Sequence, residues 1–245
     1  MKKNIGRSTS SEDEKIKICD DMPFEAAEAF KQLRTNLLFT LADKEGCKVV
    51  GVTSSIPSEG KSVTALNLAY TLTKSGNRVL LIDGDMRLPT QSTRLHVKNS
   101  PGLSNVLVGQ VRPEEAIVMP TTSMLWHFLP AGDIPPNPSE LLGSRNMGVL
   151  LNKLMPNYDM ILIDLPPINV VTDALVLSDL VDGVVVTVRE AFSSQKEVFE
   201  GISRLEFAGV KVLGFVMTQT SKRGKNNYQK SYTGSYYNGG SSRRR

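Results

Sequence analysis

The sequence contains few residues of the types that bind transition metals or form disulfide frameworks. Only two of its 245 residues are cysteine and two are histidine. Cys19 and Cys47 lie far apart and lack metal-ligand spacing, so we expect reduced thiols. His96 and His127 are too few for a histidine-rich metal centre. These absences exclude a disulfide-stapled domain and a metal site built on imidazole.

Long apolar runs are also missing. No stretch approaches the ~18–20 apolar residues that a membrane-spanning helix needs. The beginning, MKKNIGRSTSSEDEK, is polar and lacks the apolar core of a secretory signal. Because the composition is 40% hydrophobic and 22% charged, it excludes a wholly disordered or collagenous chain. We therefore expect a globular protein of the cytoplasm.

Acidic residues are absent from the end of the chain. No Asp or Glu follows Glu206, and residues 221–245 carry seven Lys or Arg and no aliphatic residue. Such a segment cannot bury enough apolar surface to fold alone, so a disordered tail is predicted. A basic tail suggests an acidic partner, nucleic acid or an anionic membrane. The alternative is a solvated tail that only keeps the protein soluble.

Between these ends, the pattern predicts an α/β domain. Residues 1–22 form a polar arm that we expect to be flexible, and 23–41 carry one apolar helical stripe. Strands are predicted at 49–53, 78–83, 124–130, 159–164, 182–188 and 210–217. Helices are predicted at 61–75, 102–118, 138–154, 172–180 and 193–208.

Several of the strand runs, such as VLLI and ILI, are continuously apolar rather than alternating. This is typical of parallel strands buried on both faces. A doubly wound, mostly parallel sheet with helices on both faces is therefore predicted for residues 23–220.

A phosphate-binding loop follows the first predicted strand. Residues 55–62, Ser-Ile-Pro-Ser-Glu-Gly-Lys-Ser, have the spacing G-x-x-x-x-G-K-[ST] with Ser55 at the first glycine. Backbone amides at a helix N-terminus favour phosphate, Lys61 reaches the β/γ-phosphates, and the hydroxyl of Ser62 ligates Mg²⁺. Nucleotide contacts are thus assigned to Ser58, Glu59, Gly60, Lys61, Ser62 and Val63. The alternative is a polar turn with a helix-capping serine.

Three carboxylates follow predicted strands. Asp83 and Asp85 come after VLLI, and Asp164 comes after ILI. The carboxyl ends of parallel strands line the crevice where open sheets place ligands, and Mg²⁺ prefers oxygen ligands. Alternatively, Asp83 and Asp85 cap a helix or pair with Arg87, and Asp164 only turns the chain before two prolines. The presence of a phosphate loop favours metal and phosphate chemistry.

These motifs resemble the bacterial tyrosine kinases (BY-kinases) of capsule and exopolysaccharide synthesis. The resemblance rests on VLLIDGDMR, MILIDLPP, EAAEAFKQLRTNLLF, PPNPSELL and the tyrosine-rich end, and covers residues 23–245. It implies a P-loop NTPase fold of the partitioning-ATPase type, with Lys61 and Ser62 serving ATP and Mg²⁺. Asp83 would be the base facing the substrate hydroxyl, with Lys61 and Asp85 also catalytic. Ser62, Asp85 and Asp164 would hold the metal.

Tyrosines are concentrated in the tail. Four of the six, Tyr228, Tyr232, Tyr236 and Tyr237, fall within ten residues. A flexible Gly/Ser segment exposes phenols without unfolding, so these four are the predicted phosphoacceptors. The alternative is a basic, aromatic segment that stacks on RNA, although no nucleic-acid partner is expected beside kinase motifs.

The first helix carries Glu28, Lys31 and Arg34 at intervals of three. One interpretation is an ion-pair ladder within the helix. The resemblance implies instead a subunit contact in a ring, where the family has E-x-x-R-x-x-R. Lys31 replaces the first arginine and lacks its planar fork, which weakens that expectation.

The resemblance implies an ATP-dependent, autophosphorylating tyrosine kinase that modifies neighbouring subunits and regulates capsular or exopolysaccharide synthesis and export. It further implies a membrane-embedded polysaccharide co-polymerase activator that recruits the kinase to the inner face of the plasma membrane, and a cognate phosphotyrosine phosphatase. The alternative is a nucleotide-switched partitioning ATPase that binds membrane or nucleoid. The partitioning relatives carry a signature lysine where this chain has Ile56, which favours the kinase. A non-catalytic RNA-binding module would leave the three acidic strand ends unexplained.

Overall fold

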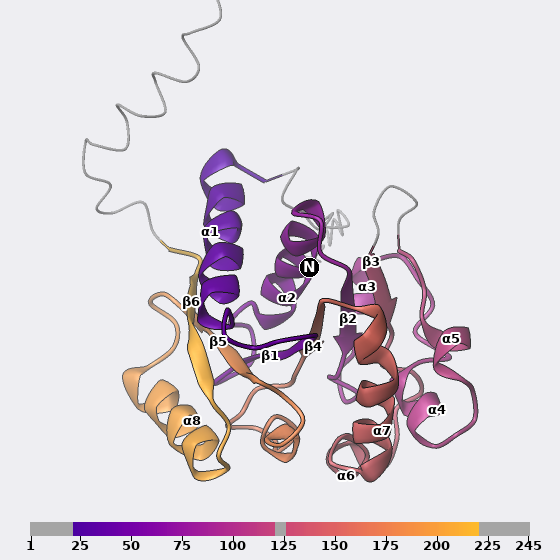
Figure 1. Cartoon of the computed structure of the whole chain (residues 1–245). Helices are drawn as coiled ribbons and strands as arrows, with labels where there is room; N and C mark the ends of the chain where they lie inside the picture. The colour runs from indigo at the N-terminus through magenta and orange to yellow at the C-terminus, as the bar shows by residue number, and fades with distance from the viewer. Residues whose placement is uncertain (1–21, 121–125, 221–245) are drawn as a thin grey trace, which may run out of the picture.

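The computed structural model describes residues 22–120 and 126–220 of the chain (Figure 1). The predicted arm, apart from Met22, lies outside the described residues, and so does the predicted tail with its four tyrosines. Cys19 lies outside them as well.

Six parallel strands form the centre of the domain. They are β1 (Lys48–Ser54), β2 (Val79–Asp83), β3 (Trp126–Leu129), β4 (Met160–Asp164), β5 (Gly183–Arg189) and β6 (Val212–Thr218). Their order in the sheet is β3-β2-β4-β1-β5-β6, and every neighbouring pair is parallel. Each strand lies within two residues of its predicted bounds. The doubly wound α/β prediction is confirmed.

Helices cover both faces of this sheet (Figure 1). On one face lie α1 (Phe24–Thr40) and α2 (Lys61–Lys74), which pack against each other. The opposite face carries α4 (Leu103–Leu107), α6 (Pro138–Leu142), α7 (Arg145–Leu154) and α8 (Gln195–Phe207). The short elements are α3 (Gln91–Arg94), α5 (Pro113–Ala116) and the 3-10 turns η2 (Met155–Asn157) and η3 (Leu175–Leu177). Among the described residues, no helix is both long and apolar enough to cross a bilayer.

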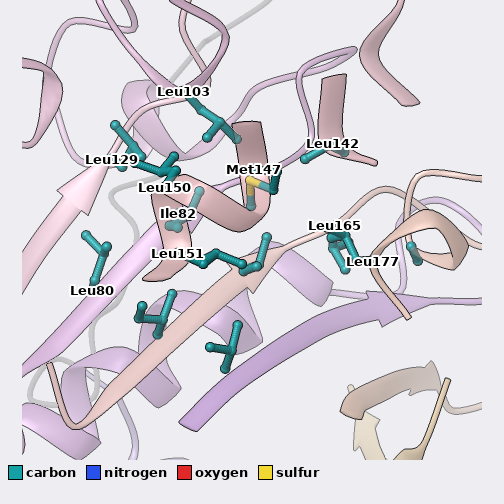
Figure 2. Packing of buried hydrophobic residues seen from close by; sticks show 14 of the residues in the cluster. Leu80, Ile82, Leu103, Leu129, Leu142, Met147, Leu150, Leu151, Leu165 and Leu177 are labelled. Carbon is teal, nitrogen blue, oxygen red and sulfur yellow. The ribbon is translucent and has the colours of Figure 1, made fainter. Parts of the chain in front are cut away.

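The continuous apolar runs reflect burial on both faces. In β2, Val79 and Leu81 belong to the cluster beneath α1 and α2, whereas Leu80 and Ile82 belong to the cluster on the other face. Figure 2 shows Ile82 beside Leu150 and Leu151 of α7, and Leu80 belongs to the same cluster. Because both faces of the strand are buried, each position selects an apolar side chain and no polar alternation remains.

Three predicted helices are shorter than expected. The segment 102–118 forms α4 and α5, because Gly109 adopts φ 77° after α4 and a proline opens α5. The segment 138–154 is divided between α6 and α7, and the Ser144 hydroxyl accepts the Met147 N–H to begin α7. The segment 172–180 holds only the 3-10 turn η3. Local turn and cap residues interrupted the helical periodicity.

Cys47 is expected to be a slow thiol in the native protein. It is free and buried just before β1. Burial, with help from Asp159 and Asp182, raises the pKa of Cys47 from 9.0 to about 11. At about pH 8 this reduces the thiolate fraction about 100-fold. Timed alkylation by iodoacetamide, resolved by peptide mass spectrometry, should therefore be at least that much slower in the native than in the denatured chain. Equal rates would contradict the prediction.

Candidate active site

The phosphate loop connects β1 to α2 at the carboxyl edge of the sheet. Gly60 directly precedes α2 with φ 90°, and Ser58 also has a positive φ of 66°. A Cβ at Gly60 would lie 3.3 Å from Cγ2 of Thr218, so both the backbone and its neighbour favour glycine. The loop therefore presents its backbone at the N-terminus of a 14-residue helix, where amides bind anions.

Glu59 anchors this loop from inside the protein. Its side chain is buried, and its Oε2 accepts the Ile56 N–H at 2.8 Å. The Ser193 hydroxyl donates to Glu59 Oε1, and the Thr218 hydroxyl donates to the Glu59 carbonyl at 2.7 Å. The loop is thus tied to the β5–α8 connection and to the end of β6. The loop motif predicts nucleotide contact for Glu59 but not this anchoring role, because two of its partners, Ser193 and Thr218, lie more than 130 residues away.

The three predicted carboxylates converge on the same loop. Asp83 and Asp164 end the neighbouring strands β2 and β4 and stand opposite each other in register. Lys61 Nζ donates to Asp85 Oδ2 at 2.9 Å and to Asp164 Oδ1 at 3.5 Å. Ser62 hydrogen-bonds to Asp164 through its side chain. The first turn of α2 therefore meets the acidic ends of both strands.

Burial and the charges of neighbouring groups shift the pKa values of Asp83, Asp164 and Lys61. Burial, followed by the charge of Asp164, raises the pKa of Asp83 well above its ordinary value. Burial also raises the pKa of Asp164, although Lys61 opposes that shift. Burial by itself would lower the pKa of Lys61, but the charges of Asp164 and Asp85 outweigh it and raise the pKa. Lys61 is thus a protonated cation that neutralises a site rich in negative charge.

The donor set fits Mg²⁺. Ser62, Asp85 and Asp164 offer hydroxyl and carboxylate oxygens, which a hard cation prefers. In this structure the Lys61 ammonium stands where positive charge is needed, between Asp85 and Asp164. A metal ion beside a nucleotide would supply further charge neutralisation at the same acids, while Lys61 turns to phosphate.

A buried glutamine that sequence analysis missed completes the site. Gln91 opens α3, and its Nε2 donates to the Ser62 carbonyl at 2.8 Å and to Asp164 Oδ2 at 2.9 Å. Its backbone N–H donates to Asp83 Oδ2 at 3.2 Å. Gln91 follows Asp85 by six residues and belongs to no recognised motif, so no local signal identified it.

Known proteins with similar sequences are consistent with a phosphate-loop site. Residues 48–207 match the family model described as "AAA domain". Over 193 residues, 79% of this chain and 84% of the relative, the sequence is 38% identical to the "Putative tyrosine-protein kinase CapB" of Staphylococcus aureus. The chain belongs to the bacterial tyrosine kinases.

Solved structures agree with that assignment. The kinase superposes on the crystal structure of the chimerical protein CapA2B2 with a TM-score of 0.75 and 37% identity, covering 80% of this chain and 85% of that one. It also resembles the septum site-determining protein MinD complexed with Mg-ADP from Pyrococcus horikoshii. That match has a TM-score of 0.60 and 26% identity, over 72% of this chain and 73% of the other. The P-loop fold shared with division-site ATPases is therefore confirmed.

Arg87 was considered above as an ion-pair partner of Asp83 and Asp85, and the structure gives it other partners. Arg87 does not pair with Asp83 or Asp85. Its Nε and Nη2 donate to the buried Asp173 at 3.2 and 3.1 Å, and Nη2 also donates to Ser139 Oγ at 2.9 Å. This connects the loops that follow β2 and β4 with α6. The capping alternative is partly correct, because Asp83 accepts an N–H at the start of α3.

The charged residues of α1 have two kinds of partner, one within the helix and one on α2. Lys31 and Glu28 form an exposed pair at 2.6 Å, as the ion-pair interpretation expects. Arg34 instead donates to the Thr71 carbonyl of α2 at 3.0 Å. Within this protomer, Arg34 therefore ties α1 to α2. The role of all three in a subunit contact stays a prediction.

Ser55 fits its glycine position because α8 presents Gly201 beside it. Ser55 has no positive φ, so the opening turn of the loop tolerates a side chain. A Cβ at Gly201 would lie 3.2 Å from Ser55 Oγ and 3.4 Å from Asn169 Oδ1. Both oxygens are buried without a hydrogen-bond partner among the described residues. The backbone of Ser55 is held in place, since its carbonyl accepts the Asn169 N–H at 3.1 Å.

Gly201→Ala is therefore expected to destabilise the kinase, although alanine is the better helix former. Overpacking a tight site costs about 1–3 kcal/mol, which exceeds the gain of about 0.5–1 kcal/mol in helix propensity. Adding Ser55→Gly removes the crowded hydroxyl and should restore part of the loss. Urea unfolding of both single variants and the double variant measures the coupling. Strict additivity would contradict the contact.

Proposed function

We propose that this kinase transfers the γ-phosphoryl group of Mg²⁺-bound ATP to tail tyrosines of neighbouring subunits. The acceptors would be Tyr228, Tyr232, Tyr236 and Tyr237. The observation that carries the proposal is the contact of Lys61 with Asp85 and Asp164 at 2.9 and 3.5 Å, at the N-terminus of the helix that follows the phosphate loop. This contact supports a site in which the groups proposed to bind phosphate and metal lie around one position.

Each group has a role that its position supports. The loop amides and Lys61 neutralise the β- and γ-phosphates, and Mg²⁺ supplies charge neutralisation when held by Ser62, Asp85 and Asp164. Asp83 orients the phenol and accepts its proton late. Moving a proton from a phenol of pKa ~10 to an ordinary aspartate of pKa ~4 would cost on the order of 8 kcal/mol. The raised pKa of Asp83 narrows this gap.

The course of the chain supports the tail as substrate. Thr218, the last residue of β6, hydrogen-bonds to Glu59 in the phosphate loop, so β6 ends beside the proposed nucleotide site. Tyr228 follows ten residues later, and an extended segment of that length spans at most about 35 Å. The chain's own site lies within this radius, and the proposal requires that a neighbouring subunit's site lies within it as well.

We also propose the biological setting that the resemblance implies. A membrane-embedded polysaccharide co-polymerase activator would recruit the kinase from the cytoplasm to the inner face of the plasma membrane. The kinase would form a homo-oligomeric ring with subunit contacts through Glu28, Lys31 and Arg34, and a phosphotyrosine phosphatase would reverse the modification. Its role would be to regulate capsular or exopolysaccharide synthesis and export. The relationship to the "Putative tyrosine-protein kinase CapB" supports the kinase role within this setting.

The decisive experiment is incubation of the full chain with Mg·ATP, followed by mass spectrometry of its tyrosine peptides. Phosphate is expected on the tail peptides and not on Tyr70 or Tyr158, which are buried. Replacement of the four tail tyrosines by phenylalanine should abolish incorporation. ATP hydrolysis without any phosphotyrosine would contradict the proposal and favour a partitioning-type ATPase.

A mixing experiment tests transfer between subunits. Lys61→Met protein with an intact tail is incubated with active protein that carries the four phenylalanine substitutions. Phosphate on the Lys61→Met chain is expected, because only a neighbour can modify it. If neither chain is modified although the unaltered chain modifies itself, transfer occurs within one subunit.

A further inference from the structure

Gln91 is the only glutamine side chain that the described structure brings into the acidic cluster. It is fully buried, with an exposed fraction of 0%. Through one amide and one backbone N–H, it contacts groups from three elements: Ser62 at the start of α2, Asp164 at the end of β4 and Asp83 at the end of β2. None of these contacts is predicted by the phosphate-loop or acidic motifs.

The side-chain amide determines how Asp164 presents its two oxygens. Nε2 occupies Oδ2 at 2.9 Å, whereas Oδ1 faces Lys61 Nζ at 3.5 Å. The same Nε2 donates to the Ser62 carbonyl at 2.8 Å. One NH₂ group therefore links the backbone of one proposed metal ligand to the carboxylate of another. Rotation of Asp164 or displacement of the first turn of α2 would break one of these hydrogen bonds.

The other atom of this amide has no partner. Gln91 Oε1 is buried and accepts no hydrogen bond among the described residues. An unsatisfied buried acceptor is unfavourable, so Oε1 favours a donor that the described residues do not supply. Mg²⁺ usually keeps several waters, and these waters donate hydrogen bonds to acceptors around the metal.

We propose that Gln91 is a positioning residue of the magnesium site: Nε2 orients Asp164 and Ser62, and Oε1 accepts a hydrogen bond from a metal-bound water. This inference rests on the proposed binding of Mg-nucleotide. Partners in the outer shell of a metal site typically account for about 10–100-fold in metal affinity. Gln91 should therefore affect Mg²⁺ binding more than nucleotide binding itself.

The test is equilibrium binding of a fluorescent ADP analogue to the full chain, titrated with Mg²⁺ and repeated in EDTA. Gln91→Met removes donor and acceptor while keeping the length of the side chain. We expect its apparent Mg²⁺ affinity to fall about 10–100-fold, with less than about threefold change in affinity in EDTA. Gln110→Met is the matched control, because Gln110 is exposed and bonds to Asn105 away from the acidic cluster.

Gln91→Asn is the second variant, should the methionine not fold. It keeps a polar amide but is one methylene too short to span Ser62 and Asp164, so the same selective loss of Mg²⁺ affinity is expected. If the folded variant matches Gln110→Met within about twofold, the proposal is overturned. A comparable loss in EDTA would also overturn it, since that indicates only a structural role.

The outcome separates this inference from the proposed function. If the unaltered chain binds Mg-ADP but phosphorylates no tyrosine, the proposed function fails while the role of Gln91 is still measured. If the unaltered chain shows no Mg²⁺-dependent ADP binding, both are overturned.

Discussion

Replacing Lys61 by methionine is expected to abolish tail phosphorylation for practical purposes, with a loss of at least about 10²–10³-fold in rate. The reason is geometric. Lys61 is the cation at the N-terminus of α2, within 2.9 Å of Asp85 and 3.5 Å of Asp164. Methionine keeps the length of the side chain but supplies no charge for the phosphates. Phosphotyrosine measured by mass spectrometry under single-turnover conditions gives the rate.

The same substitution should destabilise the nucleotide-free protein. Removing one partner of a buried ion pair costs about 3–5 kcal/mol when the other charge stays buried. The side chain of Lys61 is only 13% exposed, and Asp164 is fully buried. Millimolar Mg²⁺ should recover part of this loss, because the metal neutralises the same carboxylates.

Lys211→Met is the matched control for Lys61→Met. Lys211 is exposed and directly precedes β6, at the edge of the sheet opposite the site. It should leave both stability and phosphorylation unchanged. Retention of more than about a tenth of the transfer rate in Lys61→Met would be too much for the role assigned to this lysine.

Asp83→Asn is the second substitution with a large expected effect. If Asp83 accepts the phenolic proton, its loss should lower the transfer rate about 10²–10⁴-fold. The affinity for an ADP analogue should change little, because Asp83 belongs to neither the loop nor the proposed metal ligands. Asp43→Asn is the control, since Asp43 is exposed beyond α1. A parallel loss of nucleotide affinity would show that Asp83 acts in binding instead.

Asp83→Asn is also expected to change how the free energy of unfolding depends on pH. Burial and the neighbouring Asp164 raise the pKa of Asp83, so the folded state favours the protonated form. The unfolded chain has the ordinary aspartate pKa of 3.8. Because the pKa of Asp83 is higher in the folded state, the free energy of unfolding decreases as pH rises above 3.8. Asparagine does not titrate and removes this penalty. Without nucleotide and metal, the free energy of unfolding of Asp83→Asn, relative to that of the unaltered chain, should therefore increase as pH rises above about 4.

Chemical denaturation at several pH values measures that difference. Asp43→Asn should show no comparable trend, because Asp43 is exposed. A difference that stays constant, or that moves in favour of the unaltered chain as pH rises, would refute the assigned burial and repulsion. Nucleotide and Mg²⁺ must be removed with EDTA, since both alter the charge balance.

Much of the fold could be predicted because its signals are local. The continuous runs VLLI and ILI are buried on both faces of a parallel sheet, as their composition indicates. Helix lengths were harder, because Gly109 and Ser144 end or begin helices within otherwise periodic segments. The apolar period reports which face is buried, but single turn and cap residues determine where a helix stops.

The site divides in the same way. Residues 58–63 and the three aspartates could be proposed as site residues from the sequence, because each motif is a short segment that ends a strand or begins a helix. Gln91, Ser193 and Thr218 could not. Ser193 and Thr218 bond to Glu59 across 134 and 159 residues, and Gln91 bonds to Asp164 across 73.

The sequence by itself determined the alternation of strands and helices, the phosphate loop and the acidic strand ends, because these depend on neighbouring residues. Only the tertiary structure decided the strand order, which places β4 between β2 and β1 and thereby brings Asp164 beside Asp83 and Lys61. It also decided that Arg87 bonds to Asp173 and that Gln91 enters the acidic cluster. Strand order and distant side-chain contacts follow from packing of the whole domain, for which no short segment carries the information.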